Sequence, residues 1–375
     1  MSHPIHNLQR ALPFWASLGL LPAVAVAALY GGWALLVPSL YAWVLFSALD
    51  VFKGLNFENP DTETPDSDLF WYKLITLIWA PLQAITLFAT LAYITDAAHL
   101  VWWEKMGVAF GLGILSGTIG IVYAHELMHQ QSRLERWLGD ILMAMAQYGH
   151  FRSEHMLVHH RYVATPRDAV TARYNEGFHR FFARVLPGSL RSAWHAEAER
   201  LAKRQRPMWH PSNPFWRYAA LQAAFLILAI AVGGFTGLAL YVFAAFTAIW
   251  QLELVNYVEH YGLTRKHLGD GKYEHQQLHH SWNAAHRATN WLLINLQRHS
   301  DHHVRPDRRF PVLQTYGPDQ APQLPYGYSV MTTLAMIPPL WRRRMNPRVR
   351  HWRKQHYPHI TDWNAYNKGT NPHPA

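Results

Sequence analysis

Four long stretches without Asp, Glu, Lys or Arg constrain this 375-residue chain more than any other feature of its sequence. About 20 consecutive apolar residues suffice for a helix to cross a bilayer, so the first and last stretches are each long enough for two crossings and the middle two for one. Glycine pairs at 31–32 and 233–234 lie where the hairpins need turns. The sequence therefore predicts an all-α integral membrane protein with about six transmembrane helices, at residues 12–30, 33–49, 74–95, 106–124, 218–233 and 236–252.

The alternative is a soluble protein with buried helices, but uninterrupted apolar stretches of this length are rare in soluble cores. The first apolar segment is not followed by a convincing small-residue cleavage site. It is therefore interpreted as a retained membrane helix and not as a signal peptide. The only compositionally biased stretch, residues 59–68, is acidic and predicts a solvated loop between the second and third crossings.

The basic residues indicate the orientation. Of the 34 lysines and arginines, 29 lie in residues 126–216 and after residue 256. By the positive-inside rule, the segments 125–216 and 257–375 are then cytoplasmic, as are both termini, in a single membrane domain of residues 1–375. The arginines flank membrane spans and histidines without any recognisable nucleic-acid module. A lipid bilayer and an acidic protein are therefore the expected partners, and nucleic acid is not.

Nine histidines lie in these polar segments at helical spacings. His125 and His129 are four residues apart where the fourth span ends, in an H-E-x-x-H pattern that also occurs in zinc proteases. His155 and His159 repeat this spacing, and His160, about 100° further around a helix, is predicted to face a second metal. The other four are His260 at the end of the sixth span and the i, i+3, i+4 set His299, His302 and His303.

Nine imidazoles are too many for one ion, because a zinc ion takes four ligands, and only three of them come from the protein in catalytic sites. Two metals with four or five nitrogens each are the simplest division, although the spacing leaves open which histidine binds which metal. Imidazole suits zinc, copper, iron and nickel, and iron is favoured because a redox pair at a membrane face can activate oxygen. The chain has no cysteine, so disulfides, Fe-S clusters and thiolate-ligated haem are excluded.

The motifs HELMH, HMLVHH with RYVATPRD, NYVEHYGLTR, HHSWN and LQRHSDHH together resemble those of the membrane-bound alkane hydroxylases (alkane 1-monooxygenases). Xylene monooxygenase and the integral-membrane fatty acid desaturases, which share the histidine-box di-iron pattern, are more distant relatives. The resemblance extends from the second span to about Pro347. One departure is Gln130, where the family commonly has lysine.

The resemblance implies a cytoplasmic, histidine-rich di-iron catalytic region in a bacterial inner membrane. The implied ligands of two non-haem iron ions are His125, His129, His155, His159, His160, His260, His299, His302 and His303. The implied reaction inserts one atom of O2 into the terminal C–H bond of a medium- to long-chain n-alkane. Electrons are expected from NAD(P)H through rubredoxin reductase and rubredoxin. Carboxylates adjoining the ligands are candidates for orienting them, namely Glu126, Glu154, Glu259 and Asp301.

Two other functions remain open. A desaturase, or a hydroxylase of another lipid or of an aromatic methyl group, would use the same histidines with a differently shaped pocket. A histidine-rich metal transporter would place its ligands near the bilayer midplane, whereas these lie in cytosolic segments and at span ends. The small residues of the fourth span, such as Gly113 and Gly117, indicate either a substrate channel or close helix packing. Trp43, Trp79 and Phe88 are further candidates for a channel wall, and His279 and His280 are expected outside the ligand set.

Overall fold

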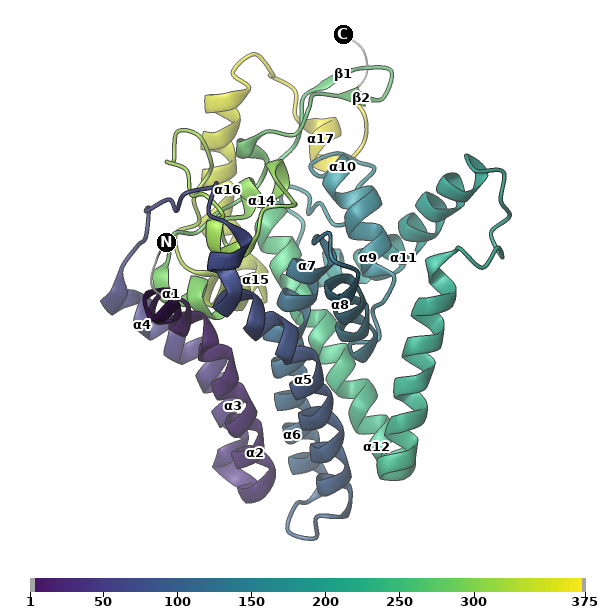
Figure 1. Cartoon of the computed structure of the whole chain (residues 1–375). Helices are drawn as coiled ribbons and strands as arrows, with labels where there is room; N and C mark the ends of the chain where they lie inside the picture. Colours follow the sequence, from purple (N-terminus) through teal and green to yellow (C-terminus); the bar gives the residue numbers. More distant parts are fainter. Residues whose placement is uncertain (1–3, 373–375) are drawn as a thin grey trace.

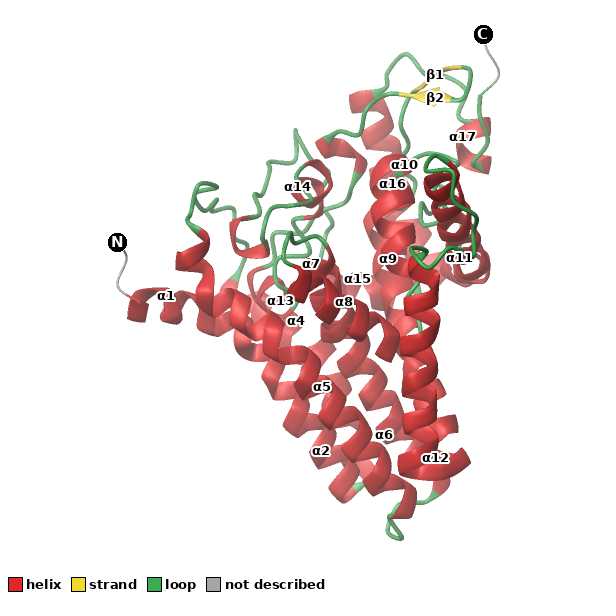
Figure 2. Ribbon diagram, turned by 45° about the vertical axis from the view of Figure 1, so that its right-hand side comes forward, coloured by secondary structure: helices red, strands yellow, loops and turns green. Residues whose placement is uncertain are grey.

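The computed structural model describes residues 4–372, and its regular secondary structure is almost entirely helical (Figures 1 and 2). The membrane part contains α1 (Pro4–Ala11), α2 (Leu20–Tyr30), α3 (Val37–Ser39), α4 (Phe46–Lys53), α5 (Phe70–Asp96), α6 (Trp102–Leu115), α7 (Val122–Met128) and α12 (Pro214–His260). The polar part contains α8 (Arg133–Met145), α9 (Phe151–Glu154), α10 (His160–Tyr162), α11 (Phe178–Ala202), α13 (Arg287–Leu292), α14 (His299–Val304), α15 (Tyr328–Ala335), α16 (Pro338–His356) and α17 (Asn364–Lys368). A small antiparallel pair, β1 (His267–Gly269) with β2 (Lys272–Tyr273), lies near the C-terminus.

Five continuous helical segments of the described chain are long and apolar enough to cross a membrane: Asn7–Tyr30, Gly32–Lys53, Asp66–Asp96, Trp102–Met128 and Pro214–His260. The last of these is α12, which folds back on itself at Gly234 and so supplies two crossings (Figure 1). The backbone there has φ 60° and ψ −154°, a conformation open essentially only to glycine. Gly31 adopts a similar conformation between the first two segments. The structure therefore has a helical segment at each of the six predicted spans and a turn at both predicted glycine pairs.

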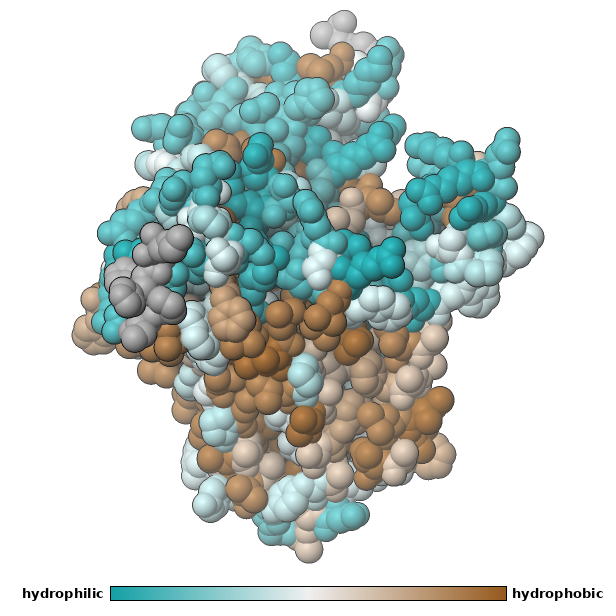
Figure 3. All heavy atoms as spheres, viewed as in Figure 1, coloured by the Kyte–Doolittle hydropathy of each residue, from teal (hydrophilic) through white to brown (hydrophobic). Residues whose placement is uncertain are grey.

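The polarity of the surface divides the molecule into two halves. Figure 3 shows a hydrophobic lower half formed by the membrane helices and a hydrophilic upper half formed by the connecting segments. Trp102, Trp103 and Trp216 lie at the ends of membrane segments and are more than half exposed, as expected for aromatic anchors at a membrane surface. The chain is therefore a multi-pass membrane protein with its polar segments gathered on one side.

The small residues of α6 allow this helix to approach the second half of α12 closely. A Cβ atom at Gly113 would lie 2.4 Å from Cβ of Thr247 and 2.7 Å from the carbonyl oxygen of Ala244. Both distances are shorter than a van der Waals contact, and one of the opposing atoms belongs to the backbone. Of the two interpretations of Gly113, close helix packing is the one that the structure supports.

Replacing Gly113 by alanine should therefore destabilise the protein, although alanine is the better helix former by about 1 kcal/mol. Overpacking against an immovable backbone typically costs about 1–3 kcal/mol, which exceeds that gain. Gly107→Ala in the same helix is the control, because a Cβ there meets only the side chain of Leu35, at 3.0 Å. Thermal unfolding in detergent should show a lower midpoint for Gly113→Ala alone. Equal midpoints for both variants would contradict the assignment.

Candidate metal centre

Eight of the nine histidines form two groups of four, whose ligand atoms lie within 4.8 Å of one another in each group. The first group consists of His125, His129, His155 and His302, and the second of His159, His260, His299 and His303. The ninth, His160, lies between the groups. Its Nε2 is 3.2 Å from Nε2 of His129 and 2.9 Å from Nε2 of His155, and its ring centroid is 4.8 Å from that of His303.

Four elements bring these side chains together at the polar end of the membrane helices. The first comprises α7 and the residue after it, where the Trp102–Met128 segment leaves the membrane and carries His125 and His129. The second is the turn η6 (His155–His159) with α10, and the third is the last residue of α12. The fourth is α14, a helix of six residues that carries the remaining three histidines.

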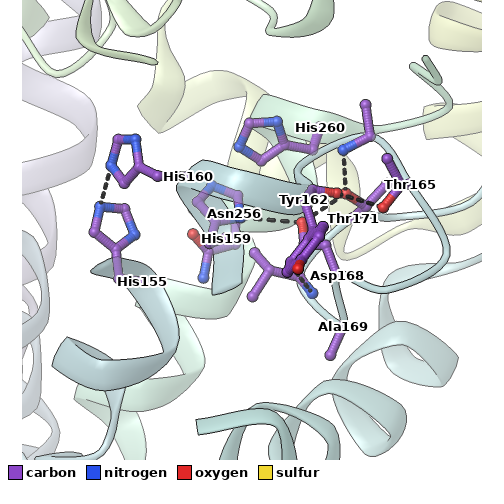
Figure 4. Close-up of polar contacts among 12 residues, drawn as sticks. His155, His159, His160, Tyr162, Thr165, Asp168, Ala169, Thr171, Asn256 and His260 are labelled. Carbon is purple, nitrogen blue, oxygen red and sulfur yellow. Dashed lines mark hydrogen bonds and ion pairs between the residues drawn. The ribbon is translucent and has the colours of Figure 1, made fainter. Parts of the chain in front are cut away.

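The turn containing His155 departs from the predicted geometry. Residues 155–159 form a π-helix, in which hydrogen bonds join residues five apart. As a result, His160 faces His155 in the first group, while His159 turns into the second group, with its ring 4.7 Å from that of His260 (Figure 4). This arrangement differs from the α-helical expectation of 100° per residue, by which His160 would face a second metal, because here His159 is the residue beside His260.

Helix α14 contributes to both groups. His299 and His303, four residues apart, have their Nε2 atoms 3.0 Å from each other. Nε2 of His299 is also 3.1 Å from Nε2 of His260. His302 points the other way, and its ring centroid is 4.4 Å from that of His125. The i, i+4 pair thus converges as predicted, whereas the i+3 residue joins the other group.

The nitrogen atoms in these groups have the properties of metal ligands. Burial lowers the pKa of His155, His160, His302 and His303 well below its usual range, and neighbouring histidines lower it further. The rings are therefore neutral, which is the form that binds metals. The Nε2 atom of His302 is buried without a hydrogen-bond partner. A buried nitrogen left unpaired costs about 1–3 kcal/mol unless a cation accepts its lone pair. The residues thus fit a pair of metal ions.

Asp168 orients one ligand and was not predicted. Its Oδ2 lies 3.0 Å from Nδ1 of His159 (Figure 4) and accepts a hydrogen bond from Oγ1 of Thr171, while Oδ1 accepts one from the Val170 amide. Interaction with His159 helps to hold the pKa of Asp168 below its usual value, against the opposing effect of burial. The carboxylate fixes the ring so that its Nε2 faces the second group. The sequence feature that could have identified Asp168 is its position at the end of the RYVATPRD motif, nine residues after His159.

The four carboxylates predicted to orient ligands have different surroundings. Glu259 lies beside the second group, with Oε2 3.3 Å from Nε2 of His299. Glu126 instead accepts hydrogen bonds from Gln130 and from the Phe310 amide. Asp301 binds Arg308, Tyr316 and the Gln314 amide. Both oxygens of Glu154 are buried without a hydrogen-bond partner.

His279 and His280 lie with Glu274 in a separate cluster that surrounds the hydroxyl group of Tyr357. Nδ1 of His280 accepts a hydrogen bond from the amide of Gln277. In a neutral ring the proton is then on Nε2, which donates to Tyr357 over 2.7 Å and has no lone pair for a metal. This hydrogen bonding agrees with the expectation that both histidines lie outside the ligand set.

The fatty acid desaturase family model matches residues 97–335, which include all nine histidines. The chain belongs to the fatty acid desaturase family. Among its relatives, alkane 1-monooxygenase 1 of Pseudomonas aeruginosa is 40% identical over 80% of this chain and 79% of the relative. Alkane 1-monooxygenase of Pseudomonas putida is 35% identical over 90% and 85%, respectively. The xylene/toluene monooxygenase hydroxylase component of Pseudomonas putida is 29% identical over 89% and 88%.

Two adjoining cavities lead from the membrane helices to the histidines of this family member. The inner cavity is bordered by His125, His155, His299 and Glu259 together with Phe151 and Leu252. The outer one is bordered by Trp43, Trp250, Tyr328 and Met336, among others. Gly117, Val122 and Val255 line both cavities. A mostly apolar passage between α7, α12 and α15 therefore ends at the metal centre.

Only some of the predicted channel residues border this passage. Gly117 and Trp43 border it, whereas Trp79 and Phe88 do not. Trp79 is fully buried and donates a hydrogen bond to Gln83, and Phe88 stacks on Phe225 with ring centroids 5.7 Å apart. These two aromatic residues pack helices together.

Replacing His302 by alanine should reduce the metal content of the purified protein by at least about half, because the first group loses a buried ligand and affinity falls strongly with each lost contact. His279→Ala is the matched control, since that ring belongs to the separate cluster around Tyr357. Metal analysis by mass spectrometry provides the measurement. A full metal complement in His302→Ala, or an equal loss in His279→Ala, would contradict the assignment.

Proposed function

We propose that this chain is a non-haem di-iron monooxygenase that hydroxylates the terminal methyl group of medium- to long-chain n-alkanes. The observation that carries the proposal is the apolar passage that ends at two groups of mostly buried histidines. Similarity to alkane 1-monooxygenases over most of the chain supports the choice of substrate. We further propose two irons per chain, held by all nine histidines, within a single domain of residues 1–375.

The overall reaction consumes one alkane, one O2, two electrons and two protons, and it yields a primary alcohol and water. When bound, the iron pair supplies the redox chemistry that cleaves O2 and attacks the C–H bond. Because the chain has no cysteine, it cannot itself hold a rubredoxin-type iron centre. We propose that the electrons come from a separate rubredoxin, which receives them from NAD(P)H through rubredoxin reductase. The concentration of basic residues in the polar segments supports an acidic partner.

The protein itself positions the substrate and controls the environment of the site. An alkane has no polar group, and each buried CH2 favours an apolar phase by about 0.8 kcal/mol, so the substrate should reach the passage from the bilayer. Val122 and Val255 would enclose the chain while the terminal methyl group lies beside His125 and His155. Asp168 holds the His159 ring in its orientation. We propose that the polar side is the cytoplasmic face of a bacterial inner membrane, with both termini there.

The function is tested by feeding n-alkanes of increasing length, xylene and a saturated fatty acid to cells that express this chain with rubredoxin and its reductase. Gas chromatography should detect 1-alkanols as the main products. Benzylic alcohols would instead support the reaction suggested by the 29% identical xylene/toluene relative. Unsaturated fatty acids would support a desaturase and contradict the proposal.

Val255→Phe should shorten the longest alkane that is oxidised, because Val255 lines both cavities and a larger ring would narrow the passage. Iron content should not change, since this side chain is not a candidate ligand. Val242→Phe on the same helix is the control, because Val242 is 47% exposed on the outer surface. The product profile across alkane lengths is the measurement. An unchanged profile in iron-loaded Val255→Phe would contradict the passage as the substrate route.

A further inference from the structure

A second opening reaches the metal centre from the polar side of the molecule. This cleft lies between α8 and α9 on one side and the end of α11 and the start of α12 on the other. The cleft is lined by His129, Met156, Leu157, Arg136, Arg152, Arg200, Arg217 and Glu197, among others. Its wall therefore contains a histidine of the first group.

His125 lies in α7 and His129 directly follows this helix, and the two side chains border different cavities. His125 borders the apolar passage, whereas His129, one turn later, borders the polar cleft. The same metal group is thus approached by an apolar route from the membrane and by a polar route from the other side. A hydrocarbon requires only the first route. The second suits a water-soluble reactant or partner.

The charge of the cleft is positive. Four arginines line it, and the nearby carboxylates are Asp140 and Glu197. Arg152 and Arg217 both bind Asp140, at 2.7 and 2.9 Å, and Arg200 binds Glu197 at 2.6 Å. Two carboxylates therefore offset four guanidinium groups. An excess of this kind attracts acidic proteins and accelerates their association.

The cleft also offers an apolar contact area beside the metal group. Met156 directly follows His155 and is 38% exposed, and half-buried Leu157 is next to it. An apolar centre with a charged rim is the usual composition of a protein–protein interface. The exposed methionine, the arginine rim and the accessible histidine together fit a protein partner better than a small anion.

We infer that this cleft is the docking site of an acidic one-electron carrier, whose electrons would pass through His129 to the iron that the first histidine group would hold. The inference rests on the proposed function, which requires two electrons per alcohol formed. Each docking event oxidises one reduced carrier and transfers one electron, so two events serve each turnover. Electron transfer slows steeply with distance, and docking over His129 would bring the carrier against a side chain of the first group itself.

Another arginine-lined pocket provides a comparison within the same molecule. It is bordered by Arg167, Arg173, Arg184 and Arg191, and it includes none of the nine histidines. Its nearest link to them is Asp168, which binds His159. Arg191 and Arg200 belong to the same helix, α11, but line different pockets. Exposed Arg191 therefore serves as a matched control for the loss of one positive charge.

The test compares Arg200→Gln and Met156→Gln with Arg191→Gln in the full-length, iron-loaded protein in lipid nanodiscs. Stopped-flow measurement of the carrier's visible absorbance gives the second-order rate of electron transfer from reduced rubredoxin. Biolayer interferometry with the iron-loaded full-length protein in the absence of alkane gives carrier binding independently of turnover. Each cleft variant should lose about fivefold in both rate and affinity, whereas Arg191→Gln should change less than about twofold. The salt dependence should weaken only in Arg200→Gln.

Equal losses in Arg191→Gln, or unchanged rates and binding in both cleft variants, would overturn this docking site. Iron content and the alkane length profile of each variant must match the wild type, which excludes an indirect effect on the metal centre. If reduced rubredoxin transfers no electrons to the wild-type protein, both the docking site and the proposed electron donor are wrong. If electrons pass and the cleft variants fail as expected but no 1-alkanol forms, only the proposed substrate is wrong.

Discussion

The mutual approach of neutral imidazole rings is the interaction on which this structure depends. Nε2 atoms of different histidines lie 2.9–3.2 Å apart in both groups. Three of them, from His129, His155 and His160, are all close to one another, and a single set of ring protons cannot satisfy such a triangle well. Burial prevents the rings from becoming charged and prevents water from solvating them. Bound cations would turn this unfavourable arrangement into a stable one.

The membrane helices make this arrangement possible. The segment that leaves the membrane at Met128 carries His125 and His129, and the second half of α12 delivers His260. The shorter elements that carry the other six histidines pack over these ends. As a result, the candidate metal centre lies at the polar ends of the membrane helices. A substrate from the bilayer and electrons from the aqueous side can then reach it by separate routes.

Much of this arrangement follows from the sequence. A charged side chain is costly inside a bilayer, so the charge-free stretches located all six crossings, and the glycine pairs located the turns. The division of the histidines into two groups could not be predicted from the sequence. Whether His159 or His160 faces a given group depends on one π-turn, and no residue type in HMLVHH specifies such a turn. Similarly, Gly113 and Gly117 look alike in sequence and both pack closely against α12, but only Gly117 also borders the cavities. Asp168 was missed because it follows the histidines at no helical spacing.

The central claim is that the two histidine groups hold an iron pair. An anomalous difference map from crystals of the purified protein, with data collected on both sides of the iron absorption edge, tests it most directly. Two iron peaks are predicted, one among His125, His129, His155 and His302 and the other among His159, His260, His299 and His303. A single peak, or a signal only at the zinc edge from protein produced in iron-rich medium, would contradict the claim.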